Sequence, residues 1–558
     1  MWKTIKNILN KGHKKQIHLQ DLQNEDGTLT KSSKESADKI NTYFSVVGKT
    51  LASKIPQPTV IPPSFQCNLN NSFFLQPTCP SEIEHVIKNL NSKKAIPLDH
   101  VPIKFIKMSS SIISIYLSDI FNNCISSGVY PDILKTAQIT PIHKTGSYEQ
   151  CSNCRPVSLL PPINKVFEKL LYDRLYNYLE HNKLLTDCQY GFRKGLSTEL
   201  AINDLHNFLT QNIDKGLVTC SIFLDLAKAF DTVNHDILLH KLDIQYGIKG
   251  LPLSLLKNYL ENRSHYVVIN DSRSAMAKFT CGVPQGSTLG PLLFLLYVND
   301  LPLVSNFKTI LFADDTVLSL SANSMHELTT KINQELESVD NWLKYNKLSL
   351  NYSKTRYMLF TKQNEYVDTN FNVQINNHLL SRTECVKYLG VIIDDKLIWK
   401  SHVTLVKKQV SKASGIVCKL RHYIPFRSLK TMYYSIVYSH LRYAITSWGS
   451  SSFSTLNTFN IIHNKLLRIM TFSKFNSNVC TLYKDTQILT IDRIFKLEIS
   501  KLMYKIKFRL VPKQFTELFT KIEDNHSYHT RQRSSIEYAI PRTRLKIAQT
   551  SFTYTTQE

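Results

Sequence analysis

Long apolar runs are missing from this chain of 558 residues. No stretch approaches the ~20 consecutive apolar residues with which a helix crosses a membrane. The N-terminal segment MWKTIKNILNKGHKKQ lacks the apolar core of a secretory signal peptide. With 42% apolar and 20% charged residues, the composition is that of a globular protein. We therefore expect a soluble, intracellular protein of about three or four domain-sized units.

Cysteine gives little support to a metal site. The chain has eleven cysteines, an odd number, scattered along its length. Only Cys151 and Cys154 have CxxC spacing, and neither a second such pair nor paired histidines follow at zinc-ribbon distance. Ordinary reduced thiols are the expectation, with a zinc site through this pair as the lesser alternative.

Negative charge is scarce. The chain has 44 acidic against 68 basic residues, which gives a net charge of +24. Residues 401–558 alone hold 25 basic and 8 acidic side chains. A surface this basic favours a polyanionic partner, nucleic acid first and an anionic membrane second. A basic tail that serves only solubility would give the same imbalance.

Apolar periodicity divides the chain into three parts. Residues 1–79 are predicted to be a helical and linker region, with a Pro-rich end that includes Pro62 and Pro63. Residues 80–400 mix helices with strands, and 401–558 are almost wholly helical. Within the middle part, helices are predicted from Ser81, over 163–181, around 234–243 and after Ser324. Strands are predicted at 133–143, 217–225, 263–283 (two), 309–320 (two), 356–360 and 386–393, the last two completing a central mixed or antiparallel sheet.

Two of these helices carry capping signals. Ser81 is followed by Glu84, and Ser324 is followed by Glu327, which is the spacing of a capping box. Both helices are therefore expected to begin with a serine side chain that accepts a backbone hydrogen bond.

Three acids stand at the ends of apolar strands. Asp225 ends the predicted strand 217–225, and Asp314 and Asp315 lie at the turn between two apolar arms. Surface turns often use aspartate, but this turn has no Gly, Asn or Pro beside the acids. Adjacent carboxylates repel each other, a cost that a bound cation would offset. If the strands are neighbours, three carboxylates converge.

Such a cluster fits phosphoryl transfer. Carboxylate oxygens are preferred ligands of Mg²⁺, which keeps its other positions for water and substrate phosphates. Two such ions clamp the attacking and leaving oxygens of an in-line displacement. Attack of a 3′-hydroxyl on the α-phosphate of a nucleotide, with release of pyrophosphate, is chemistry of this kind.

The segments around these acids resemble a known family, the reverse transcriptases of non-LTR (LINE-type, jockey-like) retrotransposons. Three segments resemble its catalytic hairpin, its first catalytic strand and its template-and-nucleotide loop: LFADDTVL (311–318), FLDLAKAFDTVNH (223–235) and GVPQGSTLGPLLFLLYVNDL (282–301). Three are similar to its finger motifs: PLDHVPIKFIK (97–107), NCRPVSLLPPINKVFEKLL (153–171) and QYGFRKGLSTELAI (189–202). Two are similar to its last palm motifs: LSLNYSKTRYMLF (348–360) and CVKYLGVIIDD (385–395).

The resemblance implies an α+β right-hand polymerase. Fingers and a palm with an antiparallel sheet would occupy 80–400, and a basic helical thumb and C-terminal region would occupy 401–558. The implied activity is RNA-directed DNA polymerisation, which adds dNTPs to a primer 3′-OH with two Mg²⁺ ions, for which Mn²⁺ can substitute. The implied partners are an RNA template, a DNA primer or target DNA and dNTPs, without a membrane.

The resemblance also assigns roles to matching residues. Asp225 and Asp314 would be the main catalytic metal ligands, with Asp315 beside them. Phe230 would pack under the sugar and reject a 2′-hydroxyl, although a core aromatic would look the same in sequence. Asp231 is expected to be structural.

Five further matching residues would bind the nucleotide or the template: Lys144, Arg155, Gln285, Gly286 and Lys354. Lys144 and Arg155 match residues that hold the triphosphate, and a guanidinium can do so bidentately. Gln285 and Gly286 match the loop that contacts nucleotide and template. Lys354 matches a lysine that protonates the leaving pyrophosphate, and an ordinary surface charge explains it equally well.

The chain departs from the family in two ways. Nothing in 1–80 is long enough for the N-terminal endonuclease of full-length elements, so no endonuclease domain is expected here and a separate one would be needed for mobility. The glycine often found in the family's "PGxDG" turn is also absent, since this chain has Ile96–Pro97–Leu98–Asp99–His100 there.

Other functions stay open on the sequence. An RNA-directed RNA polymerase shares the palm, although Phe230 argues against it. A catalytically silent nucleic-acid-binding remnant, or a maturase-like RNA-binding protein, would keep the fold and charge without synthesis. Action in the nucleus during integration is implied by the family and not by any signal in the sequence.

Overall fold

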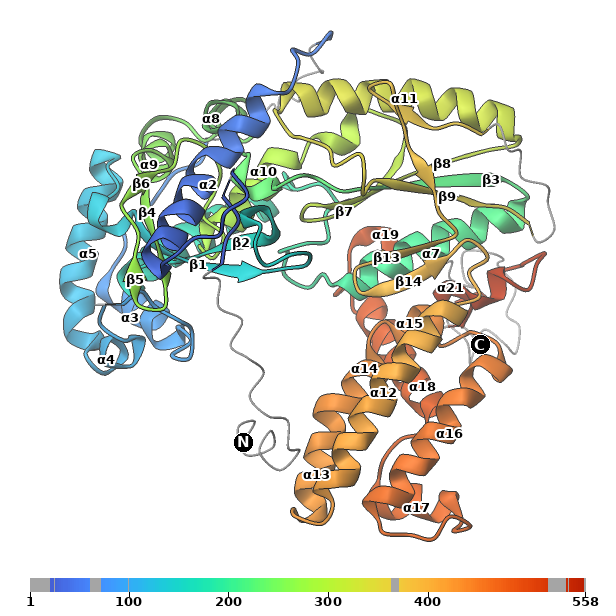
Figure 1. Cartoon of the computed structure of the whole chain (residues 1–558). Coiled ribbons are helices and arrows are strands. Elements are labelled where there is room, and N and C mark those ends of the chain that lie inside the picture. Colours follow the sequence, from blue (N-terminus) through green and yellow to red (C-terminus); the bar gives the residue numbers. More distant parts are fainter. Residues whose placement is uncertain are drawn as a thin grey trace.

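The computed structural model describes residues 21–24, 26–60, 72–98, 100–362, 371–519, 538–539 and 541–555, without the side chain of Phe453 (Figure 1). Pro62, Pro63, Asp99 and residues 1–20 of the predicted N-terminal region lie outside these ranges. The rest of that region contains α2 (Ser33–Ser53), as predicted.

A five-stranded sheet forms the centre of the molecule, in the order β12-β9-β3-β8-β7. Its strands are β3 (Val218–Leu224), β7 (Lys308–Phe312), β8 (Asp315–Ala322), β9 (Arg356–Phe360) and β12 (Ser381–Arg382). Neighbouring strands are antiparallel except β12 and β9, which are parallel, so the sheet is mixed at one edge. Every residue of β3 is buried, which explains why its sequence is continuously apolar or small and does not alternate.

The predicted strand at 386–393 does not join this sheet. It forms a separate hairpin of β13 (Cys385–Tyr388) and β14 (Val391–Asp394). Leu389 and Gly390 make its two-residue turn, both with positive φ (44° and 85°), which is the geometry of a tight hairpin. Because the segment folds back on itself, its strands pair with each other, and the prediction that it completes the central sheet is wrong.

A second sheet lies on the N-terminal side, in the order β2-β1-β4-β5 with β6 also on β4. Its strands are β1 (Thr136–His143), β2 (Cys154–Leu159), β4 (Ser264–Ile269), β5 (Ser272–Arg273) and β6 (Ala277–Lys278). The turn predicted near Asn270 is confirmed, with Asn270 and Asp271 both at positive φ. The second arm is split into β5 and β6, and α2 packs across β4 and β5 (Figure 1).

The two faces of the central sheet belong to two different cores. One face packs with α11 (Met325–Tyr345) and with the helices of the N-terminal side. These are α3 (Pro80–Asn89), α4 (Ile103–Met108), α5 (Ser110–Ser127), α6 (Pro162–His181), α8 (His235–Ile244), α9 (Gly250–Leu260) and α10 (Leu289–Val298). Small additional elements are β10 (Gln374–Ile375), β11 (His378–Leu379) and 3₁₀ turns at Asp132–Leu134, Cys151–Asn153, Ala229–Asp231 and Leu301–Leu303.

The side chains of the opposite face belong to the same core as α7 (Thr198–Lys215), the β13–β14 hairpin and the C-terminal helices, and α7 lies against the sheet (Figure 1). These helices are α12 (Lys400–Leu420), α13 (Phe426–Tyr433), α14 (Ser439–Arg442), α15 (Ile445–Trp448), α16 (Phe453–Met470), α17 (Val479–Thr486), α18 (Ile491–Lys507), α19 (Lys513–Thr516) and α21 (Phe552–Thr555), with a π turn at Tyr434–Tyr438 and a 3₁₀ turn at Ala548–Thr550. The helical character predicted beyond residue 400 is confirmed. Across the described ranges, no helix is both long and apolar enough to span a membrane.

One predicted helix cap is confirmed and the other is wrong. The Ser324 side chain accepts the Glu327 backbone N–H (3.2 Å) at the start of α11. The start of α3 is different, because Pro80 takes the first helical position and Cys79 precedes it without a side-chain cap. Proline at this position is already set to a helical φ, so the helix begins one residue before Ser81.

A buried ion pair joins α8 to the end of α10. Lys241 Nζ lies 2.8 Å from Asp300 Oδ1 and also donates to the Tyr297 carbonyl. Asp300 accepts further hydrogen bonds from Gln245 and from the Trp342 indole N–H. Both charged side chains are nearly inaccessible to water, at 2% and 12% exposure.

Removal of one partner should therefore be costly. We expect Asp300→Ala to lower the free energy of unfolding by about 3–5 kcal/mol, because it leaves the Lys241 ammonium buried and unpaired. Urea unfolding would measure this loss. Lys331→Ala breaks an exposed pair with Glu327 on α11 and should cost below ~1 kcal/mol. Equal losses for the two variants would contradict the prediction.

Candidate active site

The β7–β8 hairpin carries two of the predicted acids at its tip. Phe312 pairs with Asp315, so Ala313 and Asp314 form a two-residue turn and Asp315 is the first residue of β8. Ala313 has φ +57°, a left-handed conformation that costs a residue with a Cβ roughly 1–2 kcal/mol. The turn therefore needs support from outside the hairpin.

That support comes from residues 188–191, which lie beside β7. The Leu311 N–H donates to the Cys188 carbonyl (2.8 Å), and Gln189 Oε1 accepts from the N–H groups of both Ala313 (3.0 Å) and Gly191 (2.8 Å). A Cβ on Gly191 would come within 2.4 Å of the Ala313 nitrogen, so only glycine fits. Gln189 and Gly191 lie in a segment that is similar to a finger motif, and no local pattern in the sequence links them to a turn more than a hundred residues away.

Asp225 directly follows β3, whose last residue Leu224 pairs with Thr316. It thus comes next to Asp315 at the end of the neighbouring strand. The Asp225 N–H donates to Thr355 Oγ1 (3.3 Å), and its carbonyl accepts from the Asn351 N–H (2.8 Å). The backbone of Asp225 is held by the segment before β9, while its carboxylate is left without an ion pair to any described residue.

The three carboxylates share one electrostatic environment. Burial raises the pKa of Asp314, and the charge of Asp225 raises it further. The Asp315 side chain remains exposed, yet partial desolvation, followed by the charges of Asp314 and Asp225, raises its pKa to about 6. Ionising Asp314 and Asp315 together is therefore unfavourable in the protein alone, which is the condition that a cation relieves.

Lys144 and Arg155 are the basic groups that oppose this charge. Lys144 follows β1, Arg155 lies in β2, and both side chains are exposed. Each lowers the pKa of Asp314 and of Asp315, yet neither makes an ion pair with a described acid. Both are therefore close enough to the carboxylates to act on them electrostatically.

Whether the acids can hold a metal ion depends on whether the site is a closed structural site or an open site completed by substrate and water. Among residues with a described position, no three His, Cys, Asp or Glu side chains form a ready metal-binding group. A Mg²⁺ ion in a phosphate-transfer site, however, is usually held by one or two carboxylates together with substrate phosphates and water. The unpaired carboxylates of Asp225 and Asp314 fit that open donor set, and they do not fit a closed structural site.

Phe230 lies just beyond the first acid. Its ring is half-buried, stacks on Phe294 (centroids 4.4 Å apart) and meets the edge of Phe192 at 6.2 Å. Its carbonyl accepts the Val283 N–H (2.8 Å), which ties it to the loop before α10. The ring position is therefore fixed by packing on one side.

The Gln285–Gly286 loop is fastened to its surroundings. Gln285 Nε2 donates to Asp231 Oδ1 (2.8 Å), and burial raises the pKa of Asp231 to about 6. Gly286 has φ +122°, and a Cβ there would lie 2.5 Å from the Ser158 carbonyl oxygen of β2. Asp231 thus holds the side chain of Gln285 in this loop, which is a structural contact.

Two further lysines, Lys354 and Lys228, have different surroundings. Lys354 is exposed in the turn before β9 and is not among the charges with the largest effect on the pKa of Asp314 or Asp315. Lys228, which sequence analysis did not single out, donates from Nζ to the carbonyls of Ser152 (3.0 Å) and Cys154 (2.8 Å). It joins the chain after Asp225 to β2.

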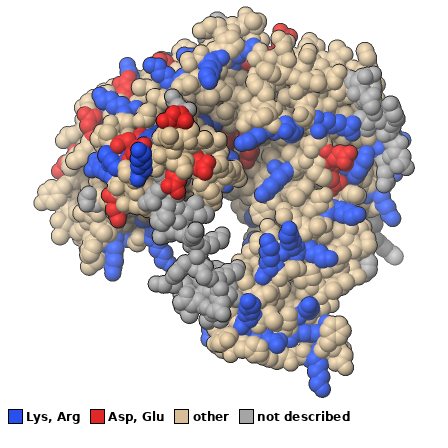
Figure 2. Space-filling view, in the orientation of Figure 1, with Lys and Arg blue, Asp and Glu red and all other residues tan. Residues whose placement is uncertain are grey.

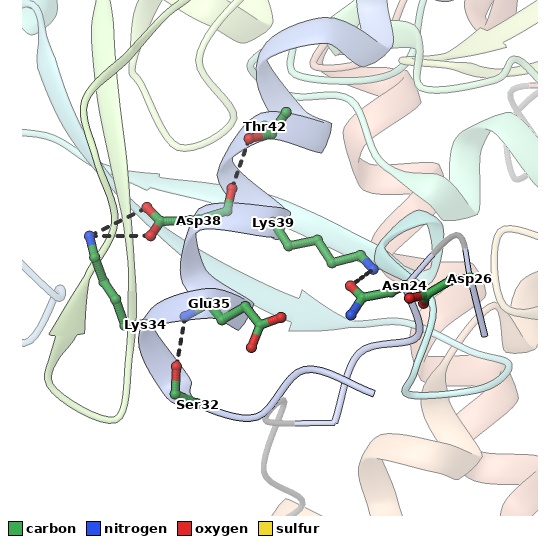
Figure 3. A pocket seen from close by; sticks show the side chains of 8 residues that line it. All are labelled: Asn24, Asp26, Ser32, Lys34, Glu35, Asp38, Lys39 and Thr42. Carbon is green, nitrogen blue, oxygen red and sulfur yellow. Dashed lines mark hydrogen bonds and ion pairs between the residues drawn. The ribbon is translucent and has the colours of Figure 1, made fainter. Parts of the chain in front are cut away.

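Two other features do not form sites. Burial raises the pKa of both Cys151 and Cys154, as expected for inert thiols. An open hollow of about 840 Å³ lies at the start of α2 (Figure 3). Its two lysines already have partners: Lys34 forms an ion pair with Asp38, and Lys39 donates a hydrogen bond to the Asn24 side chain (Figure 3).

Residues 142–393 match the family described as "Reverse transcriptase (RNA-dependent DNA polymerase)". The chain is 29% identical over 441 residues to the probable RNA-directed DNA polymerase from transposon BS of Drosophila melanogaster, covering 77% of this chain and 48% of the relative. It is 28% identical over 403 residues to the RNA-directed DNA polymerase from mobile element jockey of the same organism, covering 69% of this chain and 43% of the relative.

A more distant relative is the Retrovirus-related Pol polyprotein from type-1 retrotransposable element R1 of Bradysia coprophila, 24% identical over 410 residues, covering 71% of this chain and 39% of the relative. The chain thus spans about half the length, or less, of the curated relatives it matches. The family match includes the strands that carry all three acids and implies the polymerase palm fold for the central sheet. Residues 142–393 thus carry a reverse transcriptase domain, and the chain is similar to the RNA-directed DNA polymerases of transposon BS and mobile element jockey.

Proposed function

We propose that this chain is an RNA-directed DNA polymerase that extends a primer 3′-OH with dNTPs on an RNA template. The observation that carries the proposal is the meeting of Asp225, Asp314 and Asp315 at adjacent strand ends of the reverse transcriptase domain, unpaired and mutually destabilised. A charge cluster of this kind is unfavourable unless function requires it.

The residues of the site divide the chemistry among them. Asp225 and Asp314 would hold two Mg²⁺ ions, or Mn²⁺, which neutralise charge on the attacking and leaving oxygens. Lys144 and Arg155 face the acids and would bind the triphosphate between the two charged groups. Asp315 would contribute charge, and Lys354 would stay at the rim of the site.

The wider architecture supports a right-hand arrangement. The β1–β2–β4 sheet and its helices would act as fingers within residues 80–400, and the helices of 401–558 as a thumb. The surface is deeply indented between these parts, and Lys and Arg gather on the C-terminal side of the indentation (Figure 2). A template–primer duplex in that hollow would meet this positive surface. Action in the nucleus during integration is part of the same proposal and rests on family resemblance.

The first prediction concerns the acids. Asp314→Asn, or Asp225→Asn, should lower dNTP incorporation on a primed homopolymer RNA by at least about 100-fold, because the developing charge loses its stabilisation. Asp119→Asn, on the exposed face of α5, is the matched control and should keep full activity. Tight primer–template binding without any wild-type incorporation in Mg²⁺ or Mn²⁺ would instead identify a silent or maturase-like RNA-binding protein.

The second prediction concerns pH. A carboxyl whose pKa is raised on folding stabilises the folded state most when it is protonated, and that stability is lost as pH rises from about 4 through 6. Asp315→Asn should therefore raise Tm at pH 7.5 without divalent ions and have little effect near pH 4. Thermal unfolding at the two pH values measures this. Added Mg²⁺ should reduce the Tm difference between Asp315→Asn and the wild type at pH 7.5. A Tm difference that does not depend on pH would contradict the raised pKa of Asp315.

The third prediction concerns sugar choice. Phe230→Ala should weaken the preference for dNTPs over rNTPs by ~10–100-fold, the range within which pocket shape discriminates a hydroxyl. The ratio of kcat/KM values for dTTP and UTP on poly(rA) measures it. Phe192→Ala removes the exposed ring at the edge of Phe230 and should leave the ratio unchanged. If both variants change the ratio of kcat/KM values to the same extent, Phe230 has no specific role in sugar selection.

A further inference from the structure

A small cavity lies between the 3₁₀ turn at Ala229–Asp231, the residue before β4 and the segment that leads into the Gln285–Gly286 loop. Its lining includes Asp231, Arg263 and residues 281–284. The volume is about 10 Å³, which is room for a single water molecule. Asp231 and Arg263 are the charged residues of the lining, so the cavity offers polar partners at two points.

Each of these two charged groups has one hydrogen-bonding atom left over. Asp231 Oδ1 accepts from Gln285, whereas Asp231 Oδ2 is buried and has no partner among the described residues. Arg263 is only 2% exposed, and its Nη1 donates to the Tyr259 carbonyl (3.1 Å). Arg263 Nη2 is buried and has no described partner either. One acceptor and one donor thus line the same cavity, and buried polar atoms are rarely left unpaired.

The Arg263 guanidinium also acts on a second buried acid, Glu168 of α6. Burial raises the pKa of Glu168, and the charge of Arg263 lowers it. Glu168 Oε2 accepts the N–H of Thr288 (2.6 Å), the residue before α10. Two buried acids therefore hold one loop at two points, Asp231 at Gln285 and Glu168 at Thr288. Arg263 is the buried cation that serves both of them.

The backbone of Asp231 is fixed by close packing against two glycines. A Cβ on Gly282, which has φ +86°, would lie 2.8 Å from the Asp231 carbonyl oxygen. A Cβ on Gly48 of α2 would overlap the same oxygen. Cys281 Sγ also donates to this carbonyl (3.5 Å). Because the chain cannot shift at this point, the Asp231 carboxylate has to find its partners in the cavity and in the loop.

The charge of Asp231 decides which end of the Gln285 amide is presented. An ionised carboxylate only accepts hydrogen bonds, so Gln285 Nε2 must face Asp231 and Gln285 Oε1 must be turned away from it. A neutral amide at position 231 could donate or accept and would permit both orientations. Burial raises the pKa of Asp231 to about 6, and a hydrogen-bond donor at Oδ2 would lower it again.

We propose that Arg263 and Asp231 are positioning residues, joined by one buried water that accepts from Arg263 Nη2 and donates to Asp231 Oδ2. The bridge keeps the carboxylate charged and in place. Asp231 in turn turns the Gln285 oxygen toward the incoming nucleotide. This inference rests on the proposed polymerase function, in which the Gln285–Gly286 loop contacts substrate. Neither Asp231 nor Arg263 touches the nucleotide, and both act through Gln285.

A thermal-unfolding cycle tests the pairing without any substrate. Arg263→Gln leaves the Asp231 carboxylate buried without its counter-charge and should lower Tm, and Asp231→Asn added to it should recover part of that loss. Arg263→Lys takes its place in the cycle if Arg263→Gln does not fold. Arg193→Gln, which breaks a pair with Glu180, is the matched control, and its loss should simply add to that of Asp231→Asn. Additive losses for Arg263 and Asp231 overturn the proposal, as does a crystal structure without a water between Oδ2 and Nη2.

Nucleotide binding without chemistry tests the positioning of Gln285. The probe is the next correct dNTP, added to the full chain on an RNA template whose primer ends in a dideoxynucleotide. Asp231→Asn and Gln285→Ala should each raise the Kd of the dNTP about tenfold, the order of one lost charge-assisted hydrogen bond, and the double variant should raise it no further. An unchanged Kd in Asp231→Asn, or effects that multiply in the double variant, overturns the proposal. A wild type that shows the Tm coupling but binds no dNTP would refute the polymerase function alone.

Discussion

The mutual repulsion of Asp225, Asp314 and Asp315 is the constraint that most of the surrounding structure serves. The carboxylates sit at the ends of two adjacent strands, where burial and each other's charge raise the pKa of Asp314 and Asp315. Backbone contacts, and not ion pairs, hold them there. Gln189 supports the strained turn at Ala313, and Asn351 with Thr355 holds the chain at Asp225. The acids are therefore positioned but not neutralised.

The central sheet connects the strands that carry the acids to both hydrophobic cores of the molecule. Because β3 is buried on both faces, α11 and the N-terminal helices pack on one side while α7 and the C-terminal helices pack on the other. The basic C-terminal helices thus share a core with the strand that carries Asp225. The basic C-terminal helices and the cluster of acids are thus connected through the same sheet.

Local patterns predicted local structure well. The helix at 163–181 and the Ser324 cap of α11 were correct because apolar spacing and capping depend on residues within one or two turns. The sheet partner of 386–393 was wrong because alternation shows that a segment is extended, not which strand it joins. The cap at Ser81 failed because Pro80 starts the helix first.

The sequence by itself determined the acids, their place at strand ends, the surplus of positive charge and the order of the reverse transcriptase motifs. These properties are local or additive, so one-dimensional patterns express them. Only the tertiary structure decided that Gln189 and Gly191 hold the turn at Ala313 and that Lys228 joins β2. Such contacts join residues far apart in the chain, and they form only when packing of the two cores brings them together.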